Sequence, residues 1–98
     1  MLNVQQYREQ IVAACKQMRV KELHLFGSAL GEDFGPESDI DVLVTFDGDD
    51  ELFDRYMSLK SELEAIFDRP VDVVMEAAIR NPYFRQAVDA NRMPLYAA

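Results

Sequence analysis

Hydrophobic residues recur along this chain at two different spacings, and the change from one to the other predicts the order of its elements. A spacing of three and four positions, typical of one face of a helix, begins behind Asn3 and returns further along. A spacing of two, typical of a half-buried strand, appears between those stretches. We therefore predict helices at 4–18, 51–68 and 81–92, strands at 22–27, 39–46 and 70–75, and an extended tail at 93–98.

The order of these elements indicates an α/β fold with helices packed against a small sheet. The first two strands are joined by a loop too short for an ordinary crossover helix, so we expect a mixed sheet of three to four strands. The strand at 39–46 carries one wholly apolar face, which predicts a central position. A chain of 98 residues can bury one core and has no room for a second folding unit, so we predict a single domain over 1–98.

The composition narrows the choice of partners. Eighteen acidic against ten basic residues give a net charge of −8, which opposes binding to nucleic acid and suits a basic protein partner. The first residues lack the features of a secretory signal, and no apolar stretch is long enough to span a bilayer, so we expect a cytoplasmic protein without a membrane partner. Cys15 is predicted to be a buried thiol, and His24 to be structural or solvent-facing.

Three aspartates fall in predicted strands, where burying a charge among apolar side chains costs free energy. Asp39 and Asp41 begin one strand and would point to the same face, about 6 to 7 Å apart. Asp72 repeats the arrangement on the next strand. If the strands are neighbours, the three carboxylates converge, and a hard divalent cation such as Mg²⁺ is the natural counter-charge. The alternative is that they are exposed edge residues that oppose aggregation.

Gly27 and Ser28 supply what a metal and phosphate site still needs. A glycine lets the backbone approach a ligand closely. A serine that leads into a helical turn offers its hydroxyl and backbone N–H groups to phosphate oxygens. Gly-Ser alone is a common turn dipeptide, so the weight lies in its combination with the aspartates.

Gly27-Ser28, ten intervening residues and then Asp39-Ile40-Asp41, with a later strand aspartate, resemble the signature of the nucleotidyltransferase superfamily that includes DNA polymerase β. The resemblance is closer to its smallest members, the minimal nucleotidyltransferases (MNT) that act as antitoxins beside HEPN-domain toxins. "LHLFGS", "SDIDVLV" and "RPVDVV" are similar to the three motif strands, and "NPYFRQAVDANRMPLYAA" to the family's C-terminal end. The resemblance implies a polymerase β-like palm fold.

The resemblance also implies a chemistry, the transfer of a nucleoside monophosphate from ATP or another nucleoside triphosphate to a hydroxyl. Asp39 and Asp41 would bind two Mg²⁺ ions, with Mn²⁺ as an alternative, and position the triphosphate. Asp72 would complete the metal site and help to remove the acceptor's proton. Gly27 and Ser28 would hold the β- and γ-phosphates.

The sequence departs from the family at one point. Members often carry an arginine three or four residues after the Gly-Ser, where this chain has Leu30, Gly31 and Glu32. The nearest basic substitutes are Lys21 and Arg69, and the sequence alone places neither of them.

Three functions from different classes follow. The first is an antitoxin that adenylylates its HEPN-type toxin, with a tyrosine of the toxin as the expected acceptor. The second is a non-catalytic antitoxin that neutralises the toxin by binding, which the missing arginine favours. The third is a small-molecule nucleotidyltransferase of the aminoglycoside-modifying kind, which the length of the chain opposes because such enzymes add a substrate-binding domain to this one.

Overall fold

The computed structural model describes residues 2–31, 34–35 and 37–98, with the side chain of Ser28 also left out of the description. Its helices and strands follow the predicted order. The elements are η1 (Val4–Tyr7), α1 (Arg8–Gln17), β1 (Val20–Phe26), η2 (Gly27–Leu30), β2 (Ile40–Phe46), α2 (Leu52–Phe67), β3 (Val71–Met75), η3 (Glu76–Ala78), α3 (Pro82–Ala90) and β4 (Met93–Ala97).

Within the described ranges, four strands form one mixed sheet in the order β3-β2-β1-β4. β1 pairs with β2 antiparallel, as the short connection between them predicts. β2 pairs with β3 in parallel, and α2 forms the connection between these two strands. The predicted tail at 93–98 is extended and also joins the sheet, because β4 pairs antiparallel with β1. Pro94 is tolerated there since β4 is an edge strand, where a missing N–H costs no ladder bond on the outer side.

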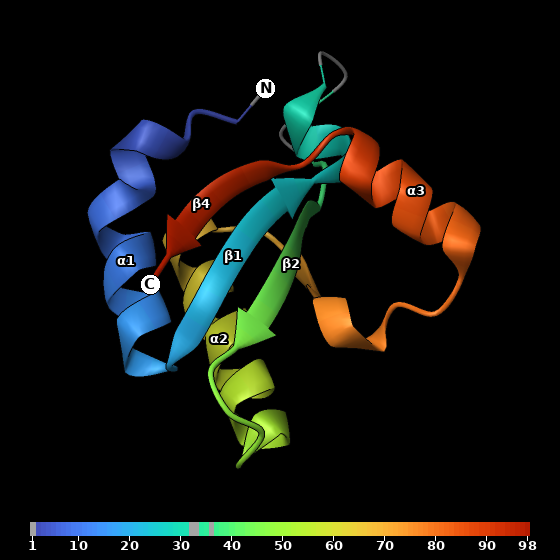
Figure 1. Ribbon diagram of the computed structural model, residues 1–98. Helices are drawn as coiled ribbons and strands as arrows, with labels where there is room; N and C mark the ends of the chain where they lie inside the picture. Colours follow the sequence, from blue (N-terminus) through green and yellow to red (C-terminus); the bar gives the residue numbers. More distant parts are fainter. Residues whose placement is uncertain (1, 32–33, 36) are drawn as a thin grey trace.

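The two faces of the sheet are covered differently. The apolar face of β2 is buried in a core with residues of α1 and α2, and Figure 1 shows α2 behind the strands. The opposite face carries Asp41, Leu43 and Thr45 of β2, by the alternation of side chains along a strand. There α3 covers only part of the sheet, where Val88 packs in a second small cluster with Leu43 and Phe26. The first carboxylate of β2 therefore lies on the less covered face.

The N-terminal helix begins later than the spacing predicts. Asn3 caps a 3-10 turn, its side chain accepting a hydrogen bond from the Gln5 N–H at 3.2 Å, and the α-helix follows from Arg8. Cys15 is buried in this helix, and burial raises the pKa of its thiol to about 12, which confirms the prediction of a buried thiol. No helix in the described part of the chain is both long and apolar enough to cross a membrane.

Candidate active site

Asp41 and Asp72 stand opposite one another on neighbouring strands. The parallel register of β2 and β3 pairs these two residues directly, so their side chains leave the same face of the sheet. The two carboxyl groups are within hydrogen-bond reach of each other. The pairing confirms that the strands are neighbours, which was the condition for the aspartates to converge.

This arrangement is electrostatically unfavourable for the chain on its own. Burial raises the pKa of Asp41, and the charge of Asp72, the hydrogen bond with it and the charge of Asp39 raise it further. Each of these effects disfavours a second negative charge at the same place. A bound cation would reverse them, because it stabilises ionised carboxylates.

Asp39 lies just before β2, two residues ahead of Asp41, and is exposed. Its charge acts on Asp41, as the raised pKa of that carboxyl shows. Among the described residues, no three His, Cys, Asp or Glu side chains are already arranged to hold a metal ion. The structure therefore brings Asp41 and Asp72 together, and the metal-binding role of all three aspartates stays a prediction.

Gly27 is the point where η2 meets the aspartates. Its φ of +75° lies in the left-handed region that favours glycine, and a Cβ at this position would lie 2.5 Å from Oδ2 of Asp41. A side chain here would therefore collide with the carboxylate. Ser28 follows within η2, but its side chain is outside the described part, so its contact with phosphate stays a prediction.

Arg69 holds the loop that leads into Asp39. Its guanidinium donates through one nitrogen to the carbonyls of Gly35 and Ser38, both at 3.0 Å, and stacks 4.4 Å from the centre of the Phe34 ring. Ser38 directly precedes Asp39. Of the two basic substitutes that the sequence offers, Arg69 thus lies beside the site, whereas Lys21 lines a separate cavity with Lys16 and Arg19.

The segment before Asp72 is held from the other side by α2. Lys60 donates to the carbonyl of Val71 at 2.6 Å, and Glu64 accepts from the Val71 N–H at 3.0 Å. These two side chains are one helical turn apart, so they reach neighbouring backbone groups. The position of Asp72 therefore depends on α2 as well as on its own strand.

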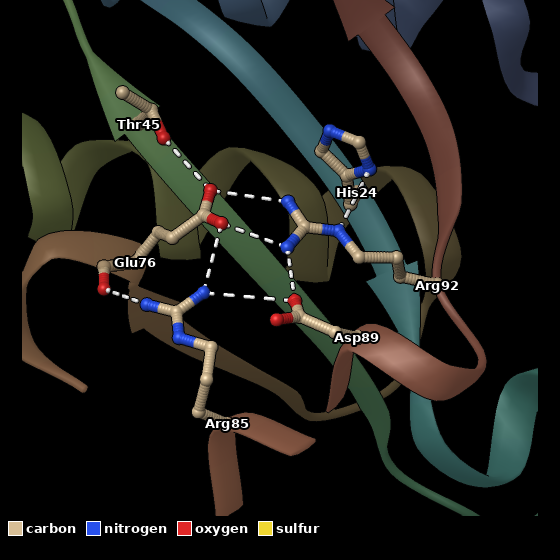
Figure 2. Close-up of polar contacts among 6 residues, drawn as sticks. All are labelled: His24, Thr45, Glu76, Arg85, Asp89 and Arg92. Carbon is tan, nitrogen blue, oxygen red and sulfur yellow. Dashed lines mark hydrogen bonds and ion pairs between the residues drawn. The ribbon is translucent and has the colours of Figure 1, made fainter. Parts of the chain in front are cut away.

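A second carboxylate group on this face of the sheet was not predicted from the sequence. Figure 2 shows Glu76 between Arg85 and Arg92, which donate to it at 3.0 and 2.7 Å, with Thr45 donating at 3.1 Å. Arg92 also reaches His24 at 3.4 Å, which gives His24 a structural role, as predicted. We call these residues the Glu76 network, and it includes Asp89, which accepts from Arg92 at 2.8 Å.

The Glu76 network has no sequence motif because its members are far apart in the chain. Arg85 and Arg92 follow Glu76 by 9 and 16 residues, and Thr45 and His24 belong to β2 and β1. The arginines hold the pKa of Glu76 at about 2, chiefly through the hydrogen bond from Arg92. The network therefore joins α3 to the sheet.

Comparison with known proteins agrees with this geometry. The family model for the nucleotidyltransferase domain matches residues 8–93. A relative from Methanocaldococcus jannaschii, MJ1379, is provisionally named a protein adenylyltransferase and is 36% identical over 72 residues, 72% of each chain. The protein adenylyltransferase MntA of Thermococcus cleftensis is 29% identical over 85 residues, which cover 83% of this chain and 85% of the relative.

Solved structures show the same fold. A structure provisionally named a minimal nucleotidyltransferase superposes with a TM-score of 0.76 at 27% identity, over 93% of this chain and 91% of its own. A complex of a tri-AMPylated Shewanella oneidensis HEPN toxin with its MNT antitoxin contains a chain that superposes with a TM-score of 0.67 at 21% identity, over 98% of this chain and 74% of that one. The match of the family model over residues 8–93, together with the 36% identity to MJ1379, shows that the chain belongs to the nucleotidyltransferase domain family, which confirms the resemblance found in its sequence.

Proposed function

We propose that this protein transfers AMP from ATP to a tyrosine hydroxyl of a HEPN-type toxin and so acts as the toxin's antitoxin. The observation that carries the proposal is the direct pairing of Asp41 with Asp72 across β2 and β3, with Gly27 packed against Asp41. That arrangement places two carboxylates beside a turn whose backbone can approach phosphate. The divalent ions that accompany a nucleoside triphosphate would supply the positive charge that such a pair of carboxylates lacks.

Divalent metal ions fit the residues present. The donors are carboxylate oxygens, which Mg²⁺ and Mn²⁺ prefer. The pKa of Asp41 is raised by burial first and then by the negative charges of Asp72 and Asp39, which a bound cation would offset. We infer that Asp39, Asp41 and Asp72 would hold two such ions. When bound, the ions stabilise the charge that develops on the attacking and leaving oxygens.

The residues of the chain then bind the phosphates and remove the proton of the acceptor. Gly27 and Ser28 hold the β- and γ-phosphates through their backbone N–H groups, so that the α-phosphorus faces the aspartates. The acceptor's hydroxyl oxygen forms a bond to the α-phosphorus while the bond from that phosphorus to the bridging oxygen breaks, and pyrophosphate leaves. Asp72, which is exposed, takes the proton of the hydroxyl. The site thus acts by positioning and by charge stabilisation.

The choice of AMP and of a toxin rests on the relatives. MntA of Thermococcus cleftensis is named a protein adenylyltransferase. One solved relative is a toxin-antitoxin with AMP-PNP, and another holds a tri-AMPylated HEPN toxin. The net charge of −8 supports a basic partner, such as a protein that binds RNA. An added AMP would place bulk and negative charge where RNA phosphates must bind.

The decisive experiment measures the mass of the partner. Purified protein, Mg²⁺ and ATP are incubated with a purified HEPN-type toxin, and intact masses are recorded. We expect the toxin to gain one or more AMP units on tyrosine, with release of pyrophosphate. If the toxin's ribonuclease activity is lost in the complex while its mass never changes, the protein neutralises the toxin by binding, the alternative that the missing arginine after Gly27-Ser28 favours.

A further inference from the structure

A pocket opens directly beside Gly27, between the end of β1 and the inner face of α3. Its volume is about 290 Å³. The residues that line it are Phe26, Gly27, Phe84, Ala87, Val88 and Asn91. Because Gly27 also packs against the carboxylate of Asp41, the pocket and the aspartates share one wall. A molecule held at the aspartates can therefore extend into the pocket.

We propose that this pocket receives the base of the nucleotide and that Phe84 and Asn91 give it a preference for adenine. The inference rests on the proposed function, because it assumes that the triphosphate lies at Gly27 and the aspartates. It goes further in assigning a specificity to residues on α3 and after it. None of these residues belongs to the motif strands from which the activity is inferred.

The aromatic wall suits a base. Phe84 keeps 40% of its surface exposed although it borders the pocket, and its ring meets that of Phe26 edge to face, with the centres 6.1 Å apart. A base can stack on an aromatic face that remains accessible in this way. Ala87 and Val88 add apolar surface without filling the space. Such a site holds the flat faces of any base and does not by itself select one.

Asn91 supplies the selective group. It follows the last turn of α3, its backbone N–H bonds to the Val88 carbonyl, and its side-chain amide has no partner among the residues that the structure describes. An amide offers one donor and one acceptor side by side, which matches the acceptor and donor that adenine presents on its N7 and N6 edge. Guanine presents two acceptors on the same edge, so the amide satisfies only one of them.

The Glu76 network keeps this wall in place. Arg85 and Asp89 lie on α3 next to Phe84 and Val88 in sequence, and Arg92 directly follows Asn91. Figure 2 shows all three bound together around Glu76. α3 is therefore fixed against the sheet before any ligand arrives, which makes the pocket preorganised.

The test measures binding with the full chain and without a toxin. Titrations with Mg²⁺ compare ATP, GTP and inorganic tripolyphosphate, which carries the charge of the nucleotide but no base. Phe84→Ala is expected to weaken ATP binding at least about tenfold and to leave tripolyphosphate binding unchanged. Asn91→Ala is expected to reduce the preference for ATP over GTP at least about threefold. Tyr83→Ala is the matched control, because Tyr83 is 82% exposed and does not line the pocket.

Two results would overturn the inference. One is a Phe84→Ala variant that binds ATP as the wild type does, or loses ATP and tripolyphosphate together. The other is unchanged ATP binding with slower toxin modification, which would assign the pocket to the acceptor side chain. If Phe84→Ala does not fold, Phe84→Leu replaces it, because leucine keeps the apolar volume and removes the aromatic face. Phe84→Leu is then expected to weaken ATP binding and to leave tripolyphosphate binding unchanged. Failure of the proposed function would be seen separately. In that case the wild-type protein would still bind ATP, but the mass of the toxin would not change.

Discussion

The same face of the sheet carries two groups of carboxylates that the chain treats in opposite ways. At the start of β2 and β3, Asp41 and Asp72 face each other, and burial and neighbouring negative charge raise the pKa of Asp41. Beyond the other end of β3, Glu76 accepts hydrogen bonds from two arginines, and its pKa is about 2. Glu76 has its counter-charges in Arg85 and Arg92, whereas no ion pair with Asp41 or Asp72 is found in the part of the chain that the structure describes.

The difference separates a structural use of charge from a functional one. A carboxylate surrounded by arginines stabilises the fold and has little left to offer a ligand. Ionised carboxylates that repel each other lower the stability of the fold, and at neutral pH a bound cation can offset that loss. The contrast therefore predicts which substitutions change activity and which change stability.

Removing the charges at the site is expected to have the largest effect. The double variant Asp39→Asn with Asp41→Asn should transfer AMP at least about a thousandfold more slowly, because the groups inferred to bind the metal ions are lost. Its far-ultraviolet circular dichroism should match the wild type. Glu62→Gln, on the exposed side of α2, is the matched control and should retain full activity. Transfer at near the wild-type rate in the double variant would contradict the metal mechanism.

Removing the charge of Glu76 should act on stability instead. Glu76→Gln puts an amide donor against two guanidinium groups, and we expect it to lower the free energy of unfolding by about 1–2 kcal/mol, a figure that allows for solvent around a carboxylate that is 23% exposed. Urea unfolding measures this loss, again with Glu62→Gln as the control. A variant with unchanged unfolding free energy would show that the network contributes nothing measurable.

The pH dependence of that loss follows from the pKa of Glu76. The folded pKa of about 2 lies below the ordinary value of 4.5, so the contribution of Glu76 is fully present above pH 4.5 and disappears as the pH falls toward 2. The difference in unfolding free energy between wild type and Glu76→Gln should therefore shrink over this range. A difference that stays constant down to pH 2 would assign the stabilisation to packing and not to charge.

The smallest effect is expected at Asp41 in the absence of metal. Asp41→Asn removes one of the mutually repelling charges, so a small rise in Tm is predicted at neutral pH. Because the folded pKa of Asp41 is raised, the wild type carries this penalty only when the carboxyl is ionised. The advantage of the variant should thus shrink as the pH falls through that folded pKa and be gone below the ordinary value of 3.8.

When metal and nucleotide are added, the wild type should have a higher Tm than Asp41→Asn. With Mg²⁺ and ATP the Tm of the wild type should rise more than with ATP and a chelator, whereas Asp41→Asn should lose that difference. Equal shifts with and without the metal in the wild type would refute a metal-dependent site.

The helices and strands β1 to β3 could be predicted because each depends on local spacing, and the same spacing put Asp41 and Asp72 on strands. The pairing of Asp41 with Asp72 needed only the assumption that their strands are neighbours. The pairing of β4 depends on contacts with β1 about seventy residues earlier, and nothing in "MPLYAA" marks that partner. The Glu76 network is hidden for the same reason, since its residues come from separate elements. The pocket requires the position of α3 on the sheet, which no periodicity specifies.

The hold of α2 on Val71 has a consequence for how a partner can dock. β3 is an edge strand, and the outward backbone groups of such a strand are a ready template for an incoming strand from another protein. At Val71 both groups are already occupied, the carbonyl by Lys60 and the N–H by Glu64. Strand addition beside Asp72 would have to displace both side chains. If the proposed function holds, we therefore expect a toxin to reach this site over the open face of the sheet and not by adding a strand at Val71.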